Sequence, residues 1–167
     1  GNGTFVGLPT TLSVGDVLDG GEGTDTVSLT ANLTAAASSA GFTTTSVENF
    51  NISTADGNAA AAHVLSINML NSSPTTITIS GASSATQDSV TLTNVDSSSQ
   101  LTLSGLANTD VNYTYDAAWL AGAGDAATLT VSGVTSGAAG DATVTYGAGL
   151  ETLNIVSSGT ASRLGAV

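Results

Sequence analysis

The chain has 167 residues, with thirteen Asp or Glu against a single basic residue, Arg163, so its formal net charge at pH 7 is −12. This charge excludes nucleic acid and anionic membrane surfaces as partners, because proteins bind both through Lys and Arg. It favours divalent cations as ligands; the alternative is that the acidity only keeps an exported surface soluble. No apolar run approaches the roughly 20 residues of a membrane-spanning helix, and we expect no membrane insertion.

The chain lacks cysteine, which excludes disulfide bonds and thiol chemistry. Its length suffices for one domain with a sizeable core, or for one segment of an elongated repeat protein. We expect one continuous domain that is a fragment of a longer chain, with a glycine-rich turn region at residues 1–30 and a repetitive region at residues 31–167.

Two short β-like runs, Thr4–Val6 and Thr11–Val14, precede the glycine-rich turn. Residues Gly20–Ser28 then match the nonapeptide G-G-x-G-x-D-x-U-x at every fixed position, with Asp25 as the carboxylate and Val27 as the buried aliphatic residue. The match predicts a turn that binds a cation and leads into a strand.

The oxygen atoms of this turn indicate which cation. Glycines 20, 21 and 23 are expected to adopt φ > 0 and to aim carbonyl groups inward, while Asp25 adds charge. Calcium takes about six to eight oxygen ligands. We therefore predict a Ca²⁺ site with Asp25 as its main ligand and with four partners, namely the side chains of Asp16 and Asp19 and the backbones of Gly21 and Gly23.

Three segments resemble a known group of proteins: G-N-G-T-F-V at the start, G-D-V-L-D-G-G-E-G-T-D-T-V-S-L-T at residues 15–30 and S-V-E-N-F-N-I-S-T at residues 46–54. They look like the calcium-binding, RTX-type repeat proteins that bacteria export by type I secretion, especially surface-layer (S-layer) proteins. The resemblance runs from Gly1 to about Thr54. It implies a calcium-dependent β-solenoid that is secreted and lies at the extracellular cell surface.

After the turn, residues Asn32–Gly41 are predicted to form a short helix, capped by Asn32 and ended by Gly41. From Val47 onward, apolar and polar residues alternate in short runs, which predicts half-buried strands. With Val27–Thr30, these strands are Phe50–Ser53, Leu65–Ile67, Ile77–Ser80, Val90–Thr93, Leu101–Ser104, Val111–Tyr115, Leu129–Ser132, Ala142–Tyr146 and Leu153–Ile155.

The predicted fold class is all-β, a parallel β-solenoid similar to a β-helix or β-roll with short Thr/Ser-rich strands; a β-sandwich is the alternative. Most strands offer only two inward aliphatic side chains, and aromatic residues make up 4% of the chain. A sandwich interior usually recruits bulkier side chains from two facing sheets, whereas a solenoid stacks small, similar rungs. The narrow core therefore favours the solenoid.

A short internal sequence repeat supports a repetitive fold. Val47–Ile52 and Leu150–Ile155 share the pattern apolar-Glu-x-apolar-Asn-Ile, which makes Glu48 and Glu151 equivalent. Each Glu is predicted to lie at a corner of a rung, where it either ligates an ion or accepts backbone N–H bonds; a solvated carboxylate at a strand edge is the alternative.

Seven further aspartates lie in turns beside the strands, four before a strand and three after one. Such residues ordinarily bond to nearby backbone amides in Asx-turns. Stacking would bring their carboxylates together, and we expect some of them to bind calcium. They are Asp88, Asp110, Asp125 and Asp141, which precede strands, and Asp56, Asp96 and Asp116, which follow them.

Catalysis has little support in the sequence, and we expect no enzyme. The only histidine, His63, adjoins an alanine run and an aliphatic strand, where a packed or surface residue is the usual reading.

Trp119 could offer a platform for ligand stacking, but its alanine neighbours favour a short helical plug on the core. Thr78, Thr91, Thr102 and Thr130 could form a glycan- or ice-binding ladder, or simply a polar outer face.

The predicted function is that of a structural, calcium-stabilised module of a secreted bacterial S-layer protein, which assembles with copies of itself into a lattice or filament at the cell surface. A cell-surface polysaccharide is a further candidate partner. The alternative is a spacer or ligand-binding module of an RTX-type adhesin.

Overall fold

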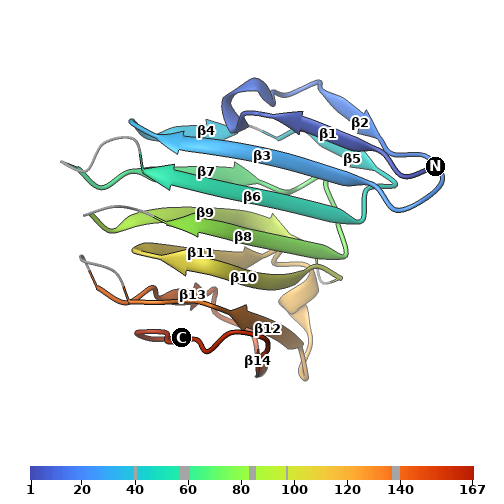
Figure 1. Cartoon of the computed structure of the whole chain (residues 1–167). Coiled ribbons are helices and arrows are strands. Elements are labelled where there is room, and N and C mark those ends of the chain that lie inside the picture. The colour runs from blue at the N-terminus through green and yellow to red at the C-terminus, as the bar shows by residue number, and fades with distance from the viewer. Residues whose placement is uncertain (40, 57–60, 83–85, 97, 137–139) are drawn as a thin grey trace.

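The computed structural model describes residues 1–39, 41–56, 61–82, 86–96, 98–136 and 140–167. The chain winds into a β-solenoid of about six turns whose strands stack in parallel (Figure 1). This arrangement confirms the predicted solenoid. The alternative β-sandwich is wrong, because a sandwich of that kind pairs antiparallel strands, whereas the paired strands described here run parallel.

The described strands form two long sheets along the stack and one short two-stranded sheet, and strands that pair lie one coil apart. Sheet A has the order β1-β3-β6-β8-β10-β12-β14, and its long strands lie in front in Figure 1. Its strands are β1 (Thr4–Gly7), β3 (Thr26–Leu33), β6 (Asn49–Asp56), β8 (Thr76–Ala82), β10 (Gln100–Ala107), β12 (Ala126–Ser132) and β14 (Thr152–Ser157).

Sheet C forms the opposite wall, in the order β13-β11-β9-β7-β4, and sheet B is a pair of short strands. The strands of sheet C are β4 (Ala37–Ser39), β7 (Val64–Asn68), β9 (Asp88–Val95), β11 (Thr109–Tyr115) and β13 (Val144–Tyr146). Sheet B pairs β2 (Val17–Asp19) with β5 (Thr43–Thr45).

The core consists of aliphatic columns that the alternating sequence creates. In sheet A, every second side chain points inward, and the register places these side chains on top of one another from coil to coil. The columns are almost wholly buried. One column contains Val27, Phe50, Ile77, Leu101 and Leu129, and the next contains Leu29, Ile52, Ile79, Leu103 and Val131.

Two sequence predictions about the first coils are wrong. The segment predicted as a helix from Asn32 instead continues β3 and then forms β4, which pairs with β7. Its Ser and Thr residues are poor helix formers, and sheet pairing satisfies their backbone groups. The run Thr11–Val14 is not a strand; its first residue, Thr11, ends a 3₁₀-helix, η1 (Pro9–Thr11), in which proline fixes φ in the first turn.

The predicted helical plug near Trp119 is present as a second 3₁₀-helix, η2 (Trp119–Ala121), and Trp119 packs against the core. Its indole ring lies 4.3 Å from the ring of Tyr115, centroid to centroid. The side chain therefore belongs to the packing of the coil corner.

Candidate functional site

The nonapeptide places Asp25 at a corner of the solenoid, immediately before β3. Its side chain is fully buried, with 0% exposed. The carboxylate oxygen Oδ1 accepts the N–H of Gly3 from the preceding coil. The second oxygen, Oδ2, is buried and has no hydrogen-bond partner in the described part of the chain. A buried polar oxygen without a partner is costly unless another group, such as a water molecule or an ion, binds it.

The glycines of the motif fulfil two different requirements. Gly21 and Gly23 have φ values of 77° and 132°, in the left-handed region, as predicted. Gly20 does not share this conformation; it is needed because a Cβ there would lie 2.0 Å from the carbonyl oxygen of Ser46 and 2.6 Å from Cβ of Asp25. The prediction of φ > 0 is therefore wrong for Gly20, where close packing on Asp25 is the constraint.

The other two predicted side-chain ligands close turns of their own. Asp16 precedes β2, and its Oδ2 accepts hydrogen bonds from the N–H and the hydroxyl group of Ser13, at 2.8 and 3.0 Å. Asp19 ends β2, and its Oδ1 accepts the N–H of Gly21 at 3.1 Å. Across the described residues, no three His, Cys, Asp or Glu side chains are grouped so as to hold a metal ion.

Glu48 completes the corner from the following coil. Its Oε2 accepts the N–H of Asp25 at 2.7 Å. In return, the carbonyl oxygen of Asp25 accepts the N–H groups of Glu48 and Asn49 at 3.1 and 3.0 Å. The Glu48 carboxylate thus satisfies a main-chain donor at the point where the strand ladder begins.

The same arrangement recurs about 100 residues later, before β12 and β14. Glu151 Oε2 accepts the N–H of Asp125 at 2.9 Å, and the carbonyl oxygen of Asp125 accepts the N–H groups of Glu151 and Thr152 at 3.2 and 3.0 Å. As at the first corner, Oδ2 of the aspartate, here Asp125, is buried without a partner among the described residues. The predicted equivalence of Glu48 and Glu151 therefore holds, in their role as acceptors of N–H bonds.

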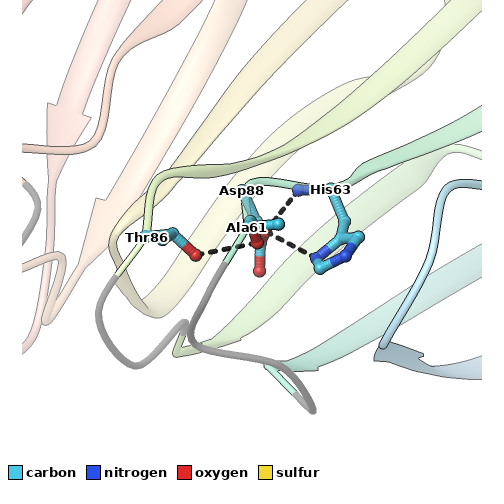
Figure 2. A network of polar contacts seen from close by, with 4 residues as sticks. All are labelled: Ala61, His63, Thr86 and Asp88. Atoms are coloured by element: carbon cyan, nitrogen blue, oxygen red, sulfur yellow. Dashed lines mark hydrogen bonds and ion pairs between the residues drawn. The ribbon is translucent and has the colours of Figure 1, made fainter.

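In sheet C, a carboxylate likewise accepts a main-chain N–H group from the preceding coil, that of His63, as Figure 2 shows. Asp88 Oδ1 accepts the N–H of His63 at 2.7 Å and lies 3.6 Å from Nδ1 of the imidazole. Both side chains are buried, and a neighbouring bond from the hydroxyl group of Thr86 to the carbonyl oxygen of Ala61 joins the same two coils at 3.0 Å. His63 is thus a packed residue, which is one of the two readings that the sequence favoured.

These corners define a set that we call the strand-start carboxylates: Asp25, Glu48, Asp88 and Glu151. Each accepts the N–H of the residue stacked on it in the preceding coil. Reasoning from sequence assigned no such common role to them, although the signal was available, since each acid stands at the start of an alternating strand or directly before it.

Of the remaining aspartates, Asp96 and Asp116 close turns, as their ordinary role predicts, whereas Asp110 and Asp141 contact residues more than 20 positions further along the chain. Asp96 accepts the N–H of Ser98 at 2.9 Å, and Asp116 accepts that of Ala118 at 2.7 Å. Asp110 accepts the N–H and hydroxyl groups of Thr143, at 2.9 and 2.6 Å. Asp141 forms an ion pair with Arg163 at 2.9 Å. The side chain of Asp56 lies outside the described residues.

Three tyrosines form a second titratable cluster, where β11 and β13 face the core; Tyr113 and Tyr115 are buried and Tyr146 is half-buried. The ring centroids of Tyr113 and Tyr115 are 5.1 Å apart, and those of Tyr113 and Tyr146 are 5.5 Å apart. Burial raises the pKa of Tyr115 to about 12, and it raises the pKa values of Tyr113 and Tyr146 further. The hydroxyl groups are therefore neutral at physiological pH, and the rings contribute to the packing of the core.

Comparisons of the chain with protein-family models, with curated proteins and with solved structures gave no match. Within the described ranges, no helix is long and apolar enough to cross a membrane.

Proposed function

We propose that this chain is a structural, non-enzymatic module of a secreted bacterial surface protein of the S-layer type, in which calcium stabilises a β-solenoid that assembles into a cell-surface lattice. The observation that carries the proposal is the buried, unpartnered Oδ2 of Asp25 inside a complete glycine nonapeptide. A cation that binds this oxygen compensates a charge that the fold has removed from water.

The chemistry of the corner suits calcium, which prefers oxygen ligands and tolerates irregular geometry. Asp25 supplies the buried carboxylate, and the left-handed Gly21 and Gly23 belong to the same turn. Asp16 and Asp19 keep free lone pairs despite their hydrogen bonds, because an ionised carboxylate can accept about four. These five residues remain our proposed calcium ligands.

Electrostatics within the stack add a second argument. Asp25 and Glu48 occupy consecutive coils at the same corner, and adjacent strands are about 4.8 Å apart. Two carboxylates at such a distance repel by about 1 kcal/mol or more. Arg163 is the only Lys or Arg side chain of the chain, and it is paired with Asp141 at another corner. A bound divalent ion would reverse the sign of this interaction.

The shape supports a structural role. Each coil contacts mainly its neighbours, so stability accumulates along the stack as in other solenoids. Inward side chains form continuous columns, and the outer positions of sheet A carry short polar side chains. Such a body can serve as a stiff building block.

The test is calcium-dependent assembly of the purified chain, followed by sedimentation and by electron microscopy of negatively stained samples. We expect ordered sheets or filaments at millimolar calcium and their loss after chelation. Isolated rods at every calcium concentration would contradict the lattice and favour the adhesin spacer. Cleavage of an acidic polysaccharide at above about 1 s⁻¹, an ordinary enzymatic rate, would contradict the non-enzymatic role.

A further inference from the structure

The outer face of sheet A is an ordered array of uncharged polar side chains. Its central column runs through the seven strands of sheet A in register, with exposed valines, Val6 and Val156, at its two ends. Between them lie Ser28, Asn51, Thr78, Thr102 and Thr130. One flanking column contains Thr30, Ser53, Ser80, Ser104 and Ser132.

Among the side chains of sheet A that the structure describes, none at an outward position is charged, although the chain carries a net charge of −12. The described acidic side chains instead lie at coil corners, in turns and on the other two sheets. Sheet C, for example, bears Asp110 at a half-buried outward position. Two copies of so acidic a chain repel through most surfaces, and sheet A offers a contact that brings no carboxylates together.

The central column also has unused hydrogen-bonding capacity. Within the described residues, the side chains of Ser28, Asn51, Thr78, Thr102 and Thr130 make no hydrogen bond to another protein group. Their donors and acceptors repeat with the strand spacing of about 4.8 Å, so a second copy presents a matching array. Short side chains of this kind interdigitate when two sheets pack face to face, about 10 Å apart.

We infer that sheet A is the face through which two copies of this chain associate. The inference rests on the proposed self-assembling function and assigns its contact surface. Thr78 is the fourth of the seven residues in the central column, so it lies near its counterpart in a twofold pair whether the two solenoids run parallel or antiparallel.

Single cysteines test this directly, because the natural chain has none. The test variant is Thr78→Cys, and the control is Thr91→Cys, which occupies the middle of the outward column Ser38, Ser66, Thr91, Asn112 and Thr145 on sheet C. Both positions are half-buried threonines on strands. With calcium present, a thiol-specific crosslinker that spans about 10 Å should join two copies of Thr78→Cys and leave Thr91→Cys single.

A charge at the same positions gives the second readout. Thr78→Asp should weaken self-association, measured by sedimentation, about tenfold or more, whereas Thr91→Asp should change it less than about twofold. Circular dichroism verifies that both variants fold.

Three results would overturn the inference. Association that persists in Thr78→Asp, with crosslinking at Thr91→Cys, would overturn this face while leaving the lattice function in place. A wild-type chain that stays monomeric at every concentration would overturn the inference and the lattice function together. Binding of a neutral polysaccharide by the monomer, lost in Thr78→Asp, would assign the face to a glycan instead.

Discussion

Glu48 and Asp25 form a reciprocal pair across two coils: the Glu48 carboxylate accepts the N–H of Asp25 at 2.7 Å, and the carbonyl oxygen of Asp25 accepts the N–H of Glu48 at 3.1 Å. The pair begins the parallel ladder between β3 and β6. The Asp25 carboxylate also accepts the N–H of Gly3 in the preceding coil. The side chains of Asp25 and Glu48 therefore connect the first three coils through hydrogen bonds. A corner built in this way fixes the register of the strands that follow.

Removing the Glu48 acceptor should destabilise the fold. Glu48→Ala leaves the N–H of Asp25 without its partner, at a cost of about 1–3 kcal/mol in the free energy of unfolding. Glu48→Gln keeps an acceptor oxygen and should cost less. Urea unfolding measures both, with Glu22→Ala, an exposed side chain, as the control near zero. Equal losses for Ala and Gln would show that charge, not the hydrogen bond, is what matters.

The aliphatic columns should tolerate truncation poorly. Ile79 is fully buried in β8, and Ile79→Ala should cost about 2–5 kcal/mol, because the stacked neighbours above and below cannot close the cavity. The adjacent Thr78→Ala, on the outer face, should change stability by less than about 0.5 kcal/mol. Similar values for the two variants in urea melts would be incompatible with a two-column core.

The sequence was sufficient to predict the strands that carry these columns. Strict alternation in segments such as Ile77–Ser80 and Leu101–Ser104 leaves one face apolar, and the structure has β8 and β10 there. It was insufficient for β2, β4 and β5, each three residues long. Such short strands contain too few residues for a period to be recognised, and pairing with neighbouring coils, rather than local preference, makes them strands.

The candidate site was only partly predictable for a related reason. The nonapeptide identified Asp25 and its glycines, because φ and charge requirements are local. The contacts of Asp25 with Gly3 and Glu48 depend on how coils stack, which a sequence pattern does not encode. For the same reason the sequence left open whether Glu48 binds an ion or an N–H group.

Glycine 20 should be the least replaceable glycine of the turn. In Gly20→Ala, the new Cβ would meet the carbonyl oxygen of Ser46 at 2.0 Å and crowd Asp25, so the corner must open. Gly21→Ala has open space and incurs mainly the left-handed backbone penalty of about 1–2 kcal/mol. Thermal melts in chelator should therefore rank Gly20→Ala well below Gly21→Ala. The reverse order would mean that the packing around Asp25 is not as described.

Alkaline pH should unfold the chain through its tyrosine cluster. Burial raises the pKa of Tyr115 from 10.0 to about 12, so the folded state favours the neutral phenol. This contribution is complete below the unfolded pKa of 10.0 and is lost as the pH rises toward 12. Denaturant melts between about pH 9 and pH 11.5 should show stability falling only above pH 10. Tyr115→Phe should flatten this fall, and an unchanged slope in that variant would contradict the assignment.

The most direct test of the account is the calcium response of Asp25→Asn. Extracellular calcium modules bind with dissociation constants of about 10⁻⁴–10⁻³ M, and a ligand at 100 times that constant stabilises the folded state by about 2.7 kcal/mol. For a chain of this length, saturating calcium should raise the melting temperature of the wild type by about 5–10 °C over its value in chelator. Asp25→Asn should lose most of that shift, because Asn keeps the Oδ1 acceptor for Gly3 but removes the buried charge, whereas Asp96→Asn should retain it. A wild-type melt that calcium and chelator leave equal, with Asp25→Asn indistinguishable from it, would contradict the calcium-stabilised corner and leave the nonapeptide as a glycine turn alone.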